Sequence, residues 1–332
     1  MAVDVSIMSR PTPSLEVLLL LRAARRTGAL EALMTTARTP AELAAETQLT
    51  DRAAQTLVEV LESEGFLAAV DGGYEPTNRS LGFFAKTDVR SIGTLPATLD
   101  RLDRGLELES VLTGDEPTPP SSVARRNRLG AAAAVDESTV RAIVTELVHL
   151  APDADRVLDV GGAPGRYAVE FAARGADVTL YDTADRLDDS AAILAHRDLH
   201  LLKSSAATLE GLAASLPRDV GADAYDLLAV VDVSHRLGPD ANRQLLEAAT
   251  SLLDPGARVA FVERLEGEPS SRAAVTSLLE TSAGRQYPTQ RYREWFDAVG
   301  LEGCAVTSVP GTAYSVVRGR VPETRSPAQA SR

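Results

Sequence analysis

Residues 156–166 read RVLDVGGAPGR, and this stretch decides the fold. It starts with a short apolar run, typical of a buried strand, and continues into a glycine-rich turn. A helical pattern follows from about Arg166 to Arg174, and residues 177–182, DVTLYD, form a second strand pattern ending in Asp182. Strand, glycine turn, helix and a strand ending in an acid predict the first half of a doubly wound, Rossmann-like α/β fold.

Such a half-fold binds nucleotides through simple chemistry. Glycines let the backbone approach the ligand, the helix N-terminus offers free N–H groups, and the acid accepts hydrogen bonds from two ribose hydroxyls. A dinucleotide fingerprint needs G-x-G-x-x-G, but from Gly161 onward the second and third glycine positions hold Ala163 and Arg166. NAD is therefore not the expected cofactor.

The stretch VLDVGGAPGRYA resembles the acid-then-glycine loop of class I S-adenosylmethionine-dependent methyltransferases. Later segments resemble one family among them, the small-molecule O-methyltransferases that carry an N-terminal winged-helix dimerisation domain. These segments are the strand and turn YDLLAVVDVSH (225–235), the helix 241–252, Asp254-Pro255-Gly256, the strand RVAFVE (258–263), and a C-terminal antiparallel hairpin over 304–318.

The resemblance implies S-adenosylmethionine as cofactor and a small molecule as methyl acceptor, with no metal. Carried over by position, it assigns cofactor binding to Asp159, Gly161, Gly162, Ala163, Gly165, the ribose-binding acid Asp182, and Ser204 at the end of the third strand. It assigns the catalytic base to His235, with Glu263 and Asp232 as candidates to orient the imidazole. The implied reaction is most simply O-methylation, with nitrogen or carbon acceptors as alternatives.

His235 also stands out without the resemblance. The sequence has four histidines, and only His235 follows a core strand at the carboxyl edge, where sheets of this kind bind their ligands. A histidine there suits general base catalysis. Glu263 ends the neighbouring strand, so it has a better claim than Asp232 to orient the ring.

The sequence departs from the family at several positions. Ala163 replaces the middle glycine of the loop, Pro164 removes one N–H donor, and Arg236 stands where an Asp usually follows the histidine. The segment 201–205, LLKSS, lacks the acid that often holds adenine. The Gly-Ala-Pro-Gly turn also resembles ribosomal-RNA ribose methyltransferases, but those need a basic face, which a net charge of −13 disfavours.

The N-terminal region predicts a winged helix-turn-helix. Residues 14–35 are dense in Leu, Thr39-Pro40-Ala41-Glu42 is a capping box, and residues 51–64 repeat apolar positions at helical spacing. Residues 66–77 then read as strand, tight turn and strand. We predict a mainly α winged-helix domain over residues 1–90.

A winged helix raises the alternative of a DNA-binding regulator whose degenerate methyltransferase domain only senses a ligand. The would-be recognition helix, 51–64, carries four acids against Arg52 alone, so it would meet the phosphate field unfavourably. We therefore favour a homodimer built through residues 14–90, with the Leu-rich first helix in a self-complementary contact. A family member that catalyses another reaction is a third alternative.

Composition restricts the partners. The chain has 47 acidic and 34 basic residues, and only Lys86 and Lys203 are lysines, so nucleic acid and membranes are not expected partners. The sequence has no secretory signal pattern, and Cys304 is its only cysteine, which predicts a cytoplasmic protein without disulfides. An acidic, lysine-poor chain indicates either a GC-rich genome or a salt-filled cytoplasm, and we favour the halophilic interpretation.

The remaining segments set the expected boundaries. Residues 91–150 read as a helical linker that contributes to the substrate pocket, with a Pro/Ser-rich stretch at 115–122, before a methyltransferase domain at 151–320 and a flexible tail at 321–332. Within the linker, Arg125, Arg126 and Arg128 either bind an anionic group or form a solvated helix start.

Overall fold

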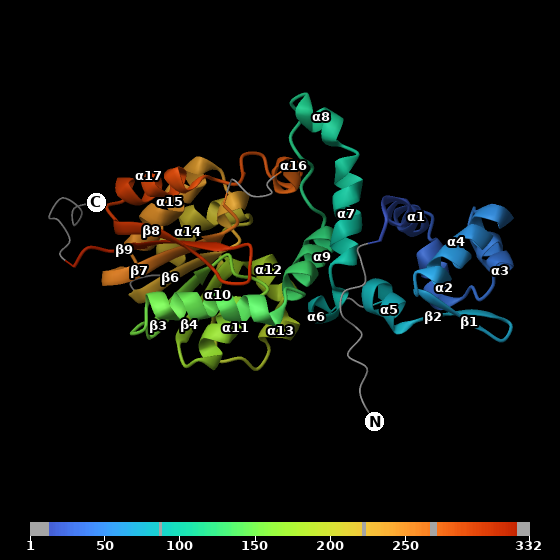
Figure 1. The fold of residues 1–332 in the computed structure, drawn as a ribbon, viewed down its shortest axis with the longest axis horizontal. Helices are drawn as coiled ribbons and strands as arrows, with labels where there is room; N and C mark the ends of the chain where they lie inside the picture. Colours follow the sequence, from blue (N-terminus) through green and yellow to red (C-terminus); the bar gives the residue numbers. More distant parts are fainter. Residues whose placement is uncertain (1–12, 86–87, 221–223, 266–270, 324–332) are drawn as a thin grey trace. The chain divides into compact units, whose positions relative to one another are not determined.

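The computed structural model describes residues 13–85, 88–220, 224–265 and 271–323 (Figure 1). The chain forms two compact units, Met1–Asp103 and Arg104–Arg332. The division into compact units falls inside helix α7 (Leu95–Gly105), and the domain boundaries at residues 90 and 150 stay predictions. Residues 324–332 of the predicted tail lie outside the described residues.

The first unit has helices followed by a hairpin, as predicted for a winged helix, with four helices before the hairpin where the sequence predicted three. Its elements are α1 (Leu15–Arg26), α2 (Ala29–Thr35), α3 (Pro40–Glu46), α4 (Asp51–Ser63), β1 (Leu67–Val70), β2 (Gly73–Pro76), α5 (Asn78–Ser80), α6 (Val89–Ile92) and most of α7. The Leu-rich segment is two helices, because Gly28 breaks it in a left-handed conformation. The predicted capping box is formed, since Thr39 and Glu42 each accept the other's backbone N–H.

A sheet of seven strands forms the centre of the second unit. Its strands are β3 (Arg156–Val160), β4 (Asp177–Thr183), β5 (His200–Ser204), β6 (Tyr225–Val231), β7 (Leu253–Glu263), β8 (Glu302–Ser308) and β9 (Ser315–Arg320). Their order is β5-β4-β3-β6-β7-β9-β8, with β5 to β7 parallel and β9 and β8 antiparallel. The predicted Rossmann-like sheet with a C-terminal antiparallel hairpin is confirmed.

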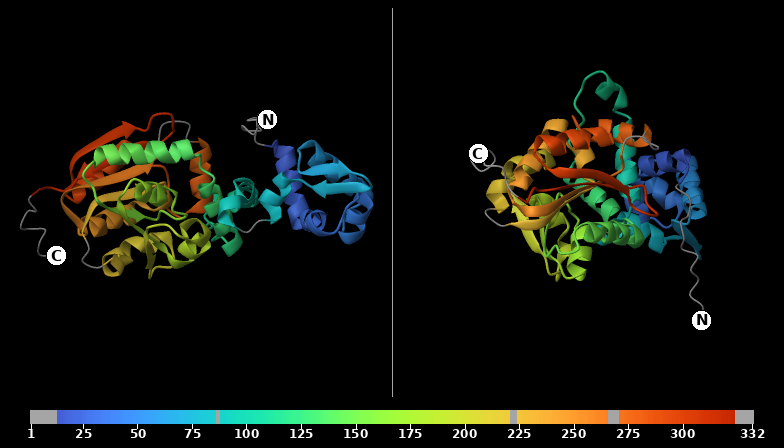
Figure 2. Two further views of the ribbon diagram at one scale, coloured as in Figure 1. Left: turned by 90° about the horizontal axis from the view of Figure 1, so that it is seen from below. Right: turned by 60° about the vertical axis from the view of Figure 1, so that its left-hand side comes forward.

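Helices cover both faces of this sheet (Figure 2). One face carries α10 (Glu137–Leu150) and α11 (Arg166–Ala173), and the other carries α14 (Leu209–Val220), α15 (Pro239–Thr250) and α17 (Thr289–Ala298). The remaining helices of the unit are α8 (Leu108–Leu112), α9 (Ser122–Ala133), α12 (Ala184–Asp189), α13 (Ala191–Leu194) and α16 (Ser271–Glu280). Because both faces are covered, most residues of the central strands are apolar and buried.

The order of the strands places the site. The chain leaves β3 toward β4 on one side and returns to β6 on the other, so the carboxyl ends of these strands face a crevice. Asp182 lies at the end of β4, Asp232 just past the end of β6, and Glu263 at the end of the neighbouring strand β7. Side chains far apart in sequence therefore meet at one edge of the sheet.

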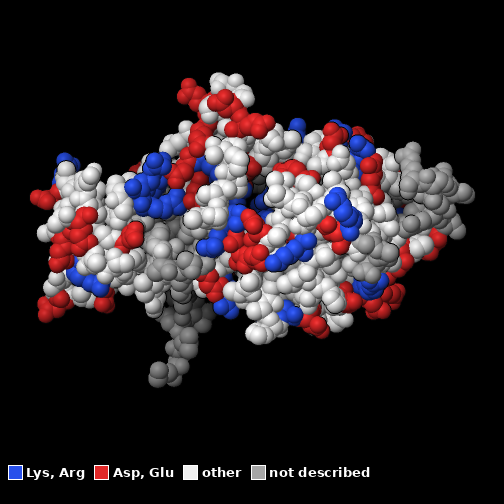
Figure 3. Space-filling model, turned by 180° about the vertical axis from the view of Figure 1, so that it is seen from behind, with Lys and Arg blue, Asp and Glu red and all other residues white. Residues whose placement is uncertain are grey.

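The surface mixes both signs of charge. On the face in Figure 3, acidic and basic side chains lie side by side rather than in separate regions. In the first unit, for example, Arg22 and Arg25 bind Asp103 at 2.6 Å. No helix in the described part of the chain is long and apolar enough to span a membrane.

Candidate active site

The glycine loop joins β3 to α11 with a tightly packed backbone. Gly161 and Gly165 have φ of +73° and +91°, a left-handed region that favours glycine. A Cβ on Gly162 would lie 2.2 Å from the Oδ2 atom of Asp159, so no other residue fits there without a shift. The Ala163–Pro164 peptide bond is cis. The loop thus brings its backbone directly against the end of β3.

Asp159 is a fully buried acid under this loop. Neither of its carboxylate oxygens has a hydrogen-bond partner among the described residues. Burial, and secondarily the negative charge of Asp182, raises the pKa of the Asp159 carboxyl to about 7. A buried acid without partners is costly, and a donor or cation brought by a ligand would satisfy it.

Asp182, the predicted ribose-binding acid, already has a full set of donors. Its Oδ1 accepts the Thr183 N–H at 2.7 Å, its Oδ2 accepts the Ala163 N–H at 3.0 Å, and the Nε of Arg186 lies 2.9 and 3.0 Å from the two oxygens. Arg186 also donates to the carbonyls of Gly161 and Ala163 at 3.3 and 2.9 Å. Asp182 and Arg186 therefore tie the glycine loop to β4 and α12.

Arg186 was not predicted from the sequence as a site residue. The sequence spacing could have indicated its contact with Asp182. Arg186 stands four residues after Asp182, at the start of a helix, and side chains at that spacing lie close together. The consequence for a ligand is direct. A ribose that donates to Asp182 has to compete with the Arg186 guanidinium.

Ser204, the predicted cofactor contact at the end of β5, is buried and turned into the protein. Its Oγ lies 2.7 Å from the Tyr181 hydroxyl and 2.8 Å from the Ser215 Oγ, and it accepts the Ala206 N–H at 3.0 Å. Asp219 completes this network. The geometry gives no support for a cofactor contact by Ser204, which stays a prediction.

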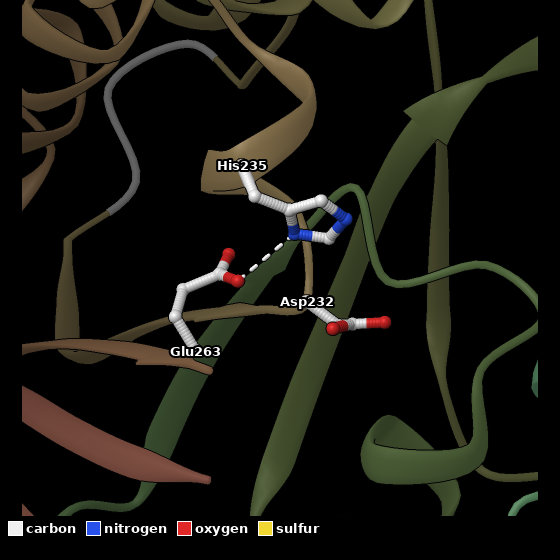
Figure 4. A group of neighbouring side chains, drawn as sticks. All are labelled: Asp232, His235 and Glu263. Carbon is white, nitrogen blue, oxygen red and sulfur yellow. Dashed lines mark hydrogen bonds and ion pairs between the residues drawn. The ribbon is translucent and has the colours of Figure 1, made fainter. Parts of the chain in front are cut away.

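His235 and Glu263 lie together at the ends of β6 and β7 (Figure 4). The His235 Nδ1 is 2.9 Å from the Glu263 Oε2, and the buried Glu263 also accepts the Ser234 N–H through Oε1 at 2.6 Å. Burial lowers the pKa of His235, but the charge and hydrogen bond of Glu263 outweigh it, so the pKa of His235 is raised overall. The predicted neighbour of the imidazole is thus in contact with it.

Asp232 lies beside this pair but is held differently. It has a left-handed backbone with φ of +58°, and its Oδ1 is 3.9 Å from the Arg264 guanidinium. In Figure 4 its carboxylate points away from the imidazole, which it does not contact by a hydrogen bond. Side-chain oxygen and nitrogen atoms of Asp232, His235 and Glu263 lie within 4.8 Å of one another, close enough to bind one metal ion. The absence of a metal stays a prediction.

Two tyrosines near Asp232 were also missed from the sequence. Burial raises the pKa of Tyr167 far above its usual value, and the charges of Tyr314, Asp232 and Asp159 act in the same direction. The Tyr314 hydroxyl accepts a hydrogen bond from Arg264 at 2.6 Å. Burial raises the pKa of Tyr314 to about 12, so both tyrosines stay protonated at neutral pH and offer hydroxyls at this edge. Tyr167 could have been predicted as a site residue from its position alone, because it lies in the first helical turn after the glycine loop.

Comparison with protein families now identifies the second unit. A family model described as a methyltransferase domain matches residues 132–306, more than half of the chain. The chain therefore belongs to the methyltransferase-domain family. The predicted membership of the class I S-adenosylmethionine-dependent methyltransferases is confirmed. Among proteins of curated function, none matches this sequence.

Solved structures match the fold over nearly the whole chain. Human N-acetylserotonin methyltransferase in complex with SAM is 16% identical, with 92% of this chain and 94% of that chain covered and a TM-score of 0.63. An O-methyltransferase family protein from Burkholderia thailandensis is 17% identical (95% and 100% covered, TM-score 0.66), and the mitomycin 7-O-methyltransferase MmcR is 15% identical (92% and 94%, TM-score 0.66). At these identities the likeness establishes the fold.

The residues at the loop fit S-adenosylmethionine (SAM), which carries an ammonium, a carboxylate and a ribose. The two orphaned oxygens of Asp159 suit a cationic or donor group, and the missing side chain at Gly162 lets the loop backbone pack against this carboxylate. Asp182 would hold the ribose after a rearrangement of Arg186. Ala163 cannot offer its N–H to the same ligand while Asp182 accepts it.

The Asp182–Arg186 pair predicts a large stability effect. Replacing Arg186 with Leu leaves a buried, uncompensated carboxylate beside Asp159, so the free energy of unfolding should fall by about 3–5 kcal/mol. Arg243→Leu is the matched control, because Arg243 and Glu247 form an i,i+4 pair whose side chains are 42% and 49% exposed. Its loss should cost less than about 1 kcal/mol.

Urea denaturation of the wild type and both variants measures the two effects side by side. Equal losses for Arg186→Leu and Arg243→Leu would show that the buried pair does not organise the loop.

Proposed function

We propose that this protein transfers the methyl group of SAM to a hydroxyl oxygen of a small molecule, with His235 as the general base. The observation that carries the proposal is the His235–Glu263 contact at the end of β6, beside the glycine loop of a methyltransferase fold. The solved relatives include enzymes described as O-methyltransferases, and one of them was solved with SAM. These likenesses support the reaction class.

The contact fixes the tautomer that a base needs. A carboxylate only accepts hydrogen bonds, so the imidazole donates Nδ1–H to Glu263 and leaves Nε2 as an acceptor. Glu263 cannot turn away, because the Ser234 N–H holds its other oxygen. In Figure 4 the Nε2 edge of the ring points away from Glu263. The ring is therefore oriented before a substrate arrives.

The chain's own contribution to the reaction is proton removal and positioning. SAM, when bound, supplies an electrophilic methyl group on a sulfonium. His235 Nε2 takes the proton of the acceptor hydroxyl as the oxygen becomes a nucleophile, and Glu263 stabilises the imidazolium that forms. General base catalysis of this kind contributes about 10²–10⁴ in rate. Holding the two reactants in line contributes much of the rest.

Calorimetric titration with SAM tests the cofactor. Wild type should bind, and Asp182→Ala should bind at least about tenfold more weakly, because hydrogen bonds to a charged group are worth about 1.5–3 kcal/mol. Ser204→Ala should leave the affinity unchanged, since its hydroxyl is bonded to Tyr181 and Ser215.

A tenfold loss in Ser204→Ala would instead establish its predicted cofactor role. No binding by the wild type would overturn the cofactor assignment, and equal binding by Asp182→Ala would overturn the ribose assignment.

The state of His235 predicts a pH dependence. Its pKa is raised above the ordinary value of 6.5, so the protonated form persists to higher pH and the base becomes available only as the pH rises past that pKa. The rate should therefore rise with pH to a plateau. Glu263→Gln removes the negative charge that raises the pKa, so the midpoint should move to lower pH.

NMR titration of labelled histidine checks this without a known substrate. The chain has four histidines, so a His235→Gln variant assigns the signal. A His235 midpoint that Glu263→Gln leaves unchanged would contradict the proposed coupling.

The homodimer through residues 14–90 remains a proposal, and α1 supports it. Leu15 and Leu19 are 59% and 41% exposed on that helix, so an apolar surface is available for a second copy. Light scattering after size-exclusion chromatography at high salt should give a dimer, and Leu15→Arg with Leu19→Arg should give a monomer. A monomeric wild type at micromolar concentration would count against the contact.

The alternative of a DNA-binding regulator gains no specific support. Helix α4 exposes Asp51, Glu59 and Glu62, and Arg52 is its only basic residue. The cytoplasmic location and the halophilic interpretation stay predictions from composition.

A further inference from the structure

A cavity of about 400 Å³ lies in the same unit as the His235 site. Its walls come from residues 116–120, from α9, from the segments after β4 and β5, from the turn after β6, and from the end of α16. Leu209 and three prolines supply apolar surface. Its basic residues are Arg125, Arg128, Arg186 and Arg236. Four arginines around one cavity are unusual in a chain of net charge −13.

Three of these arginines have carboxylate partners. Arg125 binds Asp189 at 2.9 Å and Asp185 at 3.1 Å, and Arg186 binds Asp182 at 2.9 Å. Arg128 lies 3.6 Å from Glu280. Their charges are largely compensated inside the protein.

Arg236 is different. Among the described residues its guanidinium has no hydrogen bond and no ion pair, although it is only partly exposed. Burial, then the charges of Arg186 and Arg128, lowers the pKa of Arg236 to about 10, against a smaller opposite effect of Glu280 and Asp182. It therefore remains charged at neutral pH. Besides Glu280, the carboxylates of the wall are Glu116, Asp185 and Glu210, which are exposed, where solvent screens them.

A partly buried guanidinium without a carboxylate partner is unfavourable unless an anion joins it. Guanidinium groups bind carboxylate and phosphate oxygens with paired N–H donors, which suits such an anion. Arg236 lines the cavity and directly follows His235 in the 3₁₀ turn Ser234–Arg236.

We propose that Arg236 binds the carboxylate or phosphate group of an anionic methyl acceptor, whose hydroxyl is then presented to His235. The assignment of the ligand as acceptor rests on the methyltransferase function proposed above. The binding of an anion by Arg236 does not depend on it. Arg128 and Arg186 line the same cavity, but each already has a carboxylate partner, so Arg236 is the group left to bind the anion.

Calorimetric titrations with benzoate and with inorganic phosphate at fixed ionic strength test the proposal. The wild type should bind at least one of them, and the one that binds identifies a carboxylate or a phosphate site. Benzamide, the neutral counterpart of benzoate, should bind at least tenfold more weakly than benzoate if the site takes carboxylates. Arg236→Gln should lose at least tenfold in affinity for the anion, and Arg236→Lys should recover part of it.

Arg243→Gln is the matched control, because it removes the same charge from exposed helix α15 and should leave anion binding unchanged. Equal anion affinity in Arg236→Gln and Arg243→Gln, or no binding of either anion by the wild type, would overturn the proposal.

Titration of the same proteins with SAM separates the two proposals. If SAM binds and neither anion does, only the Arg236 assignment fails. Anion binding without SAM binding would contradict the methyltransferase function and the acceptor assignment with it.

Discussion

The buried pair of Asp182 and Arg186 is the contact on which the architecture of the site depends. One carboxylate at the end of β4 accepts from the backbone of the glycine loop, and the guanidinium that neutralises it donates back to two carbonyls of that loop. The loop, residues 161–165, has no side chain at Gly162 and contains no charged residue that could hold it in place. Its shape is therefore set from the neighbouring strand and from the helix that follows.

The 3₁₀ turn Ser234–Arg236 after β6 places two neighbouring side chains, His235 and Arg236, in different surroundings. His235 points toward Glu263 at the end of β7, while Arg236 lines the cavity beside α9 and α16. A 3₁₀ turn separates consecutive side chains by about a third of a rotation, which allows this division. In the proposed reaction, the base and the anion-binding group are thus placed by a single backbone feature. A shift of this turn would disturb both.

The sequence predicted the sheet and the His235–Glu263 contact because both follow from local pattern. Apolar runs such as 157–160 and 225–231 identify strands, and neighbouring parallel strands end at one edge, so acids and histidines at their ends must meet. Arg186 was missed because its role depends on how the start of α12 bends over the loop. Ser204 points inward because its position in β5 faces the core. Residues alternate between the two faces of a strand, so a shift of one residue in the strand register would turn its side chain to the opposite face. The sequence showed that Arg236 stands where the family usually has an Asp. It could not show that Arg128 and Arg186, from other elements, line the same cavity, because that depends on the tertiary structure.

The internal ion pair at Asp182 also bears on how quickly a cofactor exchanges. A ribose that takes the place of Arg186 has to separate the pair on entry, and the pair re-forms on departure. Part of the binding free energy is therefore spent within the protein, equally for the methylated cofactor and for its demethylated product. In the proposed cofactor site, Arg186 is thus an intramolecular competitor that lowers the affinity for both. A site built this way favours turnover over tight retention.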